Sequence, residues 1–193
     1  MRRKAPLTQP FGRPAVHADL SPVVAATAQW LTRSFPASGG ALSAALCEVQ
    51  ARQAVTVAAR LRYPTAMDAA LVGVAGPGGS ARLDWVTGAD TGTADDPGAA
   101  DERHAWRTWV DEVVASWAAC LLGDPRLAAR AVAALAEDGT GGAPGEFRRL
   151  LEPDEADRRA AALLRHPDLL APVGALHHAG LVDRLAPDHT LTA

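Results

Sequence analysis

The 193-residue chain contains no Asn and no Ile, and among its 19 Lys and Arg residues only Lys4 is a lysine. The missing residues are those with A/T-rich codons, which indicates a G/C-rich bacterial genome rather than a demand of the fold. This bias weakens two familiar signals. Ala is the best helix former, but here it is abundant everywhere, and abundant Arg does not by itself indicate nucleic-acid binding.

The net charge is small, and cysteine and long apolar runs are scarce. The net charge of −3 provides no general attraction to phosphate backbones or anionic membranes. Cys47 and Cys120 are isolated, so we expect both to be buried as small hydrophobic residues. No segment reaches the roughly 18 apolar residues that a membrane span needs, and no apolar signal region follows the basic residues 2–4. We expect a cytoplasmic protein with no membrane partner.

The first 20 residues are rich in Pro and, up to Asp19, carry only basic charge. Residues 1–20 are therefore predicted to form an extended basic arm, because Pro interrupts regular structure and chain termini are often loosely packed. An arm of this kind can lie on a partner or on a neighbouring subunit. We take Arg2, Arg3 and Lys4 as candidate partner-binding residues.

Two helices are expected first in the region 21–87. Ser21 and Pro22 suit the start of a helix, with Ser as the N-cap and Pro at the first helical position. That helix should end before Pro36, because the residue before a proline avoids the helical conformation. A second helix is predicted over about 41–50, where apolar residues recur at helical spacing.

A three-stranded antiparallel sheet is expected next. Apolar and polar residues alternate over 55–63 and 82–87, which is typical of half-buried strands, and residues 70–75 suit a more buried strand. The Gly-rich stretch 73–79 is interpreted as a hairpin turn. The predicted inward side chains of this meander are Val57, Leu61, Val72, Val74, Leu83 and Trp85.

The remainder is predicted to be an acidic flexible loop over 88–102 and a helical region over 103–193, which forms one compact domain with 21–87. A long amphipathic helix should begin near Glu102, and Asp124-Pro125 should start the next one. The stripe of the long helix consists of Trp106, Val110, Val113, Trp117 and Cys120 or Leu121. The predicted fold class is therefore α+β: N-terminal helices, a three-stranded antiparallel meander and an all-helical C-terminal half.

The last residues resemble the end of a winged-helix domain. Leu176 to Leu185 resembles a recognition helix that ends in a Gly180-Leu181-Val182 step, and Pro187-Asp188 suits the turn of a small wing-like hairpin. The resemblance covers about thirty residues and implies a transcription regulator. The chain departs from that pattern because no Arg or Lys lies between Asp168 and Ala179 to meet phosphate or a base edge.

No pattern in the sequence predicts catalysis, a cofactor or a metal. His177 and His178 are adjacent, and His166 and His189 lie eleven residues to either side, whereas a zinc site on a helix wants ligands about four residues apart. No nucleophile elbow or phosphate-binding loop occurs. Trp109 lies at the edge of the apolar stripe, so we take it as a fourth candidate partner-binding residue.

The sequence thus predicts a non-catalytic accessory or protein-interaction protein, in a homo-oligomer or a larger assembly, with a protein and not a nucleic acid as its partner. Two alternatives stay open. One is a winged-helix-like transcription regulator. The other is a small enzyme whose site is assembled from scattered residues, since active sites are recognised by geometry rather than by sequence order.

Overall fold

The computed structural model describes residues 19–89, 104–139, 142–143 and 145–186. Within these ranges the chain forms helices joined by loops, with no strand. One element, η1, is a 3-10 helix. The elements are α1 (Ser21–Ser34), α2 (Ala41–Arg62), α3 (Ala66–Ala75), α4 (Ala81–Thr87), η1 (Ala105–Trp109), α6 (Glu112–Gly123), α7 (Pro125–Glu137), α8 (Arg148–Leu151), α9 (Glu155–Ala160), α10 (Pro167–Gly174) and α11 (His178–Arg184).

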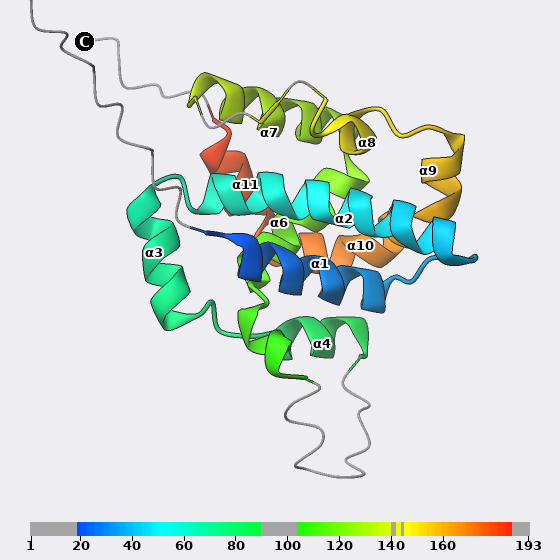
Figure 1. Cartoon of the computed structure of the whole chain (residues 1–193), viewed down its shortest axis with the longest axis horizontal. Helices are drawn as coiled ribbons and strands as arrows, with labels where there is room; N and C mark the ends of the chain where they lie inside the picture. The colour runs from blue at the N-terminus through cyan, green and yellow to red at the C-terminus, as the bar shows by residue number, and fades with distance from the viewer. Residues whose placement is uncertain (1–18, 90–103, 140–141, 144, 187–193) are drawn as a thin grey trace, which may run out of the picture.

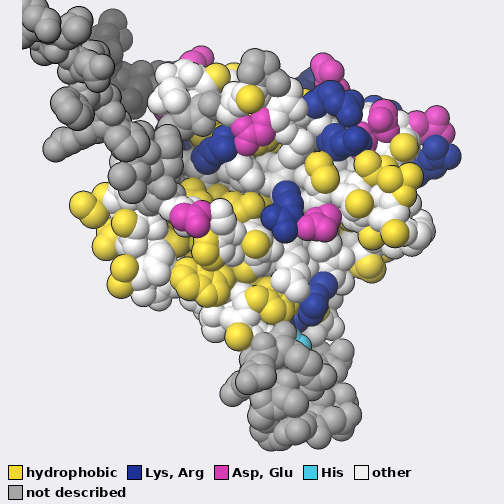
Figure 2. Space-filling view, in the orientation of Figure 1, with side chains coloured by type: hydrophobic (Ala, Val, Ile, Leu, Met, Phe, Trp, Pro, Cys, Tyr) yellow, Lys and Arg dark blue, Asp and Glu magenta, His cyan; other side chains and the backbone are white. Residues whose placement is uncertain are grey.

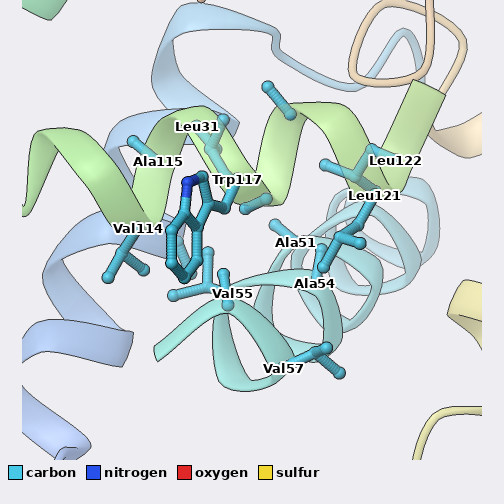
Figure 3. Packing of buried hydrophobic residues seen from close by; sticks show 14 of the residues in the cluster. Leu31, Ala51, Ala54, Val55, Val57, Val114, Ala115, Trp117, Leu121 and Leu122 are labelled. Carbon is cyan, nitrogen blue, oxygen red and sulfur yellow. The ribbon is translucent and has the colours of Figure 1, made fainter. Parts of the chain in front are cut away.

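The long helix α2 runs through the middle of the molecule, with α1 on one side and α7 and α8 on the other (Figure 1). Helix α6 crosses α2 and makes the most extensive contact in the fold. Figure 3 shows Trp117 and Leu121 of α6 pointing toward the face of α2 that carries Ala51 and Val55. One hydrophobic core cluster includes buried residues from α1 and α2 as well as from most of the later helices. The core is therefore built around α2.

The strand predicted over 55–63 is wrong, because these residues form the C-terminal half of α2. Buried residues occur there at successive positions, 57, 58 and 59 among them, because other helices pack around this half. A narrow polar stripe with Arg52, Thr56 and Arg60 stays outside this packing. Small Ala residues occupy several of the buried positions, so the larger Val and Leu side chains alternate with other residues as they would in a strand.

The other two predicted strands are also wrong. Residues 70–75 lie in α3 and residues 82–87 form most of α4. Of the side chains predicted to face inward from these two segments, Leu83 is buried and Val72 is half-buried, whereas Val74 and Trp85 are largely exposed. The α+β fold class with its meander is therefore replaced by an all-helical fold over the described residues.

The long helix predicted from Glu102 is interrupted. Residues 105–109 form η1, and α6 begins at Glu112 after an extended Val110 and Asp111. Asp111 is the N-cap of α6 and accepts a hydrogen bond from the backbone N–H of Val114 at 2.9 Å. An N-cap carboxylate satisfies a backbone donor that the first turn leaves free. The structure confirms the helices predicted to start near Ser21 and at Pro125. The predicted N-cap role of Ser21 is wrong, because the N-cap is Leu20 and no side chain caps α1.

The C-terminal segment does not have the winged-helix geometry over the residues described. Gly180, Leu181 and Val182 lie inside α11, and its C-cap is Leu185. The expected wing turn at 187–188 lies outside the described residues. Gly180 is exposed and packs beside Trp117, where a Cβ atom would lie at an ordinary contact distance of 3.7 Å from the ring. The two-strand wing is therefore not part of the described structure.

The two predicted flexible segments fall almost wholly outside the described part of the chain. Only residues 19–20 of the arm and 88–89 of the acidic loop belong to it. Across the described helices, none combines the length and the apolar character that crossing a bilayer requires.

Candidate docking surface

Helix α3 is fixed at its start by a capping box. Thr65 accepts a hydrogen bond from the backbone N–H of Asp68 at 3.1 Å, and the Asp68 carboxylate accepts one from the backbone N–H of Thr65 at 3.1 Å. This reciprocal arrangement satisfies donors that a helix start would leave free. It also engages Asp68, the only charged residue of the helix. The rest of α3 is uncharged.

The unusual property of α3 is that its apolar residues face solvent. Met67, Leu71 and Val74 are 68%, 61% and 90% exposed, and Ala69 is the only buried residue of the helix. The three large side chains follow an i, i+4, i+7 spacing, so they form one stripe. Figure 2 shows hydrophobic side chains gathered over α3 at the edge of the molecule. A helix this apolar is normally covered by protein.

A hollow of about 580 Å³ lies at the C-terminal end of α3. One wall is the loop that joins α3 to α4, in which Gly76, Gly78 and Gly79 have positive φ angles, a backbone region that glycine enters without strain. The lining residues are Val74, Ala75, Gly76, Gly78, Gly79, Ser80, Ala81, Arg107, Thr108 and Trp109. The hollow is thus lined largely by small residues and backbone, with a tryptophan on the η1 side.

Buried hydrogen bonds hold this hollow in shape. The buried Asp84 of α4 accepts hydrogen bonds from Trp30 Nε1 at 2.9 Å and from Ser80 Oγ at 2.8 Å, and it forms an ion pair with Arg107. Trp30 belongs to α1, so the carboxylate ties α4 and η1 to the core. Because each partner is a donor to one ionised carboxylate, the network is satisfied and directional. The hollow is therefore anchored by side chains that sequence reasoning did not bring together.

The second aromatic feature of this region is Trp85, which is 75% exposed on α4. Trp85 follows Ala81 by four residues, so both lie on the same side of α4, and Ala81 lines the hollow. We call Met67, Leu71, Val74 and Trp85, together with the hollow, the α3–α4 face. Sequence reasoning missed this face because it assigned Val74 and Trp85 to the core.

The structure places only one of the four candidate partner-binding residues. Trp109 is half-buried, packs against the core and contributes to the hollow. Arg2, Arg3 and Lys4 lie outside the described residues. The α3–α4 face is therefore built without the predicted basic arm, and Trp109 is its single link to the sequence-based candidates.

A larger hollow, of about 630 Å³, lies between α1, α2 and the start of α3. Its two arginines are already paired, since Arg60 binds Glu146 at 2.9 Å and Arg52 binds Glu48 at 2.8 Å. Its other carboxylate, on Asp19, accepts a hydrogen bond from the backbone N–H of Ser21 at 2.9 Å. Figure 2 shows basic and acidic side chains next to one another over α2. This hollow therefore offers a ligand little uncompensated charge.

One cluster contains the residue types of a hydrolytic site. His177 Nε2 lies 2.7 Å from Glu112 Oε1, and the Ser116 hydroxyl lies nearby. However, Ser116 is fully buried, donates to the carbonyl of Gly174 at 2.9 Å and accepts from the backbone N–H of His177 at 3.0 Å. A nucleophile needs a base at its hydroxyl and access to substrate. Here the serine joins α6 to the α10–α11 connection instead.

Among the described residues, no group of three or more His, Cys, Asp or Glu side chains is placed to hold a metal ion. His166 and His178 are exposed at separate positions, and His177 pairs with Glu112. His189 lies outside the described residues.

The two cysteines are free, with Cys47 buried and Cys120 half-buried. Burial raises the pKa of Cys120 from its ordinary value of 9.0 to about 11, and it also raises the pKa of Cys47. We expect both thiols of the native protein to react with iodoacetamide at pH 8 at least about tenfold more slowly than a free thiol, because only the thiolate attacks. Mass spectrometry of the alkylated protein measures this, with the urea-unfolded chain as control. Equal rates in the two states would contradict the packing of both residues.

A scan against protein-family models, a search of curated proteins and a search of solved structures each found no match to this chain. The geometry therefore defines the class of protein. Over its described residues the chain is all-helical, and it presents an apolar face that is exposed to solvent.

Proposed function

We propose that this protein is a non-catalytic, cytoplasmic interaction protein that acts by docking a protein partner on its α3–α4 face. The observation that carries the proposal is the exposure of the apolar stripe Met67, Leu71 and Val74 on a helix that buries only Ala69. Large exposed apolar patches on soluble proteins mark contact surfaces, because covering them removes apolar area from water.

The chemistry of the face favours a protein over other partners. Asp68, the only acidic residue of α3, is engaged in the capping box, and the charge of Arg107 is balanced by Asp84. A nucleic-acid surface needs clustered Lys and Arg to neutralise phosphates. An exposed Trp beside a small-residue hollow is instead typical of the anchors that dominate protein interfaces.

The test is affinity capture of partner proteins in the organism that encodes this chain. It compares the proteins that are captured by two variants of the full chain. Leu71→Glu places a charge on the α3 stripe, and we expect it to lower the recovery of the specific partner at least about tenfold, since desolvating an unpaired charge in an apolar interface is costly. Because Leu71 is 61% exposed, the fold should tolerate the change.

Leu42→Glu is the matched control. Leu42 is 74% exposed near the start of α2, and α3 follows the other end of that helix (Figure 1). The same substitution there should leave partner recovery unchanged. If both variants retained the partner, or both lost it while staying folded, the α3–α4 face would not be the docking site.

A further inference from the structure

We propose that the occupant of the α3–α4 face is a second copy of this chain, with Trp85 of each copy inserted into the hollow of the other. This inference rests on the proposed function, because it names the partner of the same face. It is argued from the shape, the charge and the arrangement of the residues that the face contains.

The face offers both a projecting side chain, Trp85, which we call the knob, and a hollow, which we call the socket. Trp85 projects from α4, and the hollow of about 580 Å³ begins one helical turn away, at Ala81. A two-fold axis between knob and socket would bring Trp85 of one copy to the hollow of the other, and the reverse. Such isologous contacts use the same patch on both copies and close after two. A knob without a neighbouring socket would need a foreign partner.

The socket has the lining that an indole ring needs. Gly78 and Gly79 expose backbone rather than side chains on one wall, and Trp109 provides an aromatic surface on another. Tryptophan pairs prefer offset or edge-to-face contacts, which gain about 0.5–1.5 kcal/mol beyond the area that they bury. Val74 stands at the rim and is 90% exposed, so it would pack on the incoming ring.

The charge distribution permits self-association. When a face meets its own copy, every unbalanced charge meets the same sign, which disfavours charged faces in two-fold dimers. Here Arg107 is paired with Asp84, and the exposed Arg82 of α4 is paired with Glu112 at 3.1 Å. The large side chains that remain, on α3 and at Trp85, are apolar. The described part of the face thus carries little net charge to repel a second copy.

The face is small, and small interfaces are typical of transient contacts. A helix of 10 residues is about 15 Å long, so the α3 stripe and one tryptophan per copy give an interface at the low end of specific contacts, below about 1,200 Å². We therefore expect a reversible dimer that dissociates in the micromolar range.

Analytical ultracentrifugation of the full chain over roughly 1–200 µM, the range that matches the expected affinity, provides the test. The mean mass should rise from 20.0 kDa toward twice that value. Trp85→Ala removes the knob and Val74→Glu blocks the socket, and each should weaken association at least about tenfold, as loss of an interface anchor does. Leu42→Ala is an exposed control that should associate like the wild type.

Mixing the two defective variants tests the reciprocal geometry. The Trp85→Ala chain keeps its socket and the Val74→Glu chain keeps its Trp85, so the mixture should form a heterodimer with one intact contact, although neither variant associates alone. A general loss of folding could not produce this rescue. A wild type that stays monomeric, a Trp85→Ala chain that associates normally, or a mixture without rescue would each overturn the inference.

The outcome is separable from that of the proposed function. A monomeric wild type whose capture of another protein is abolished by Leu71→Glu would overturn self-association and leave the docking function in place. A wild type that dimerises through Trp85 but captures no other protein would support the inference, and it would restrict the docking function to the second copy.

Discussion

Replacing Trp30 by alanine is expected to lower the free energy of unfolding by about 3–5 kcal/mol, the usual loss for a large aromatic residue removed from a core. Trp30 is 1% exposed, and its Nε1 donates to Asp84 at 2.9 Å. The substitution therefore leaves a cavity and deprives a buried carboxylate of a donor. Urea titration followed by circular dichroism at low micromolar protein provides the measurement.

Trp85→Ala is the matched control for this prediction. Trp85 is mostly exposed, so its loss should change the free energy of unfolding by less than about 1 kcal/mol, as surface substitutions do. The sequence pattern alone predicted the reverse for Trp85, in the core of a sheet. A larger loss from Trp85→Ala than from Trp30→Ala would contradict the helical fold.

Replacing Asp157 by alanine is expected to destabilise the protein by about 2–3 kcal/mol, because it removes a buried carboxylate together with its ion pair with the partly exposed Arg149 and the capping-box hydrogen bond from the backbone N–H of Asp154. Asp157 is fully buried in α9 and pairs with Arg149, and its backbone carbonyl accepts a hydrogen bond from Gln50 of α2 at 2.9 Å. The residue thus joins the C-terminal helices to the central one. Thermal and urea unfolding would both report the loss.

The control for Asp157 lies on the same helix. Glu155 and Arg159 form an exposed pair at 3.9 Å, and exposed pairs of this kind contribute well under about 1 kcal/mol. Glu155→Ala should therefore leave the midpoint of unfolding nearly unchanged. Similar losses for the two variants would show that burial of Asp157 does not have the energetic effect assigned to it.

Helix starts were the part of the fold that the sequence predicted well. Ser21-Pro22 and Asp124-Pro125 both mark helix N-termini in the structure. These signals are local: a proline fixes the backbone within the first turn in both helices, and the Asp124 carboxylate caps α7, whereas Ser21 makes no side-chain cap. Thr65 and Asp68 form a capping box of the same kind, and attention to that spacing would have shown that a helix follows.

Whether a helix is buried or exposed along its length could not be predicted in the same way. The second half of α2 is buried at consecutive positions, because it is surrounded, whereas α3 is the more apolar of the two and is exposed. Tertiary packing decides this difference, and a single sequence contains no direct record of it. The hollow shares this origin, since it depends on Asp84 meeting Trp30 and Arg107 from distant segments.

The most direct test of the α3–α4 face as a docking surface is photo-crosslinking in living cells. A photoreactive phenylalanine derivative is placed at Leu71 on α3 or, as control, at Leu42 on α2, two positions that are both well exposed. We expect a discrete covalent adduct from position 71 and none from position 42. An adduct of twice the chain mass would identify the second copy as the occupant. Absence of any adduct at position 71, with efficient crosslinking at position 42, would contradict the central claim.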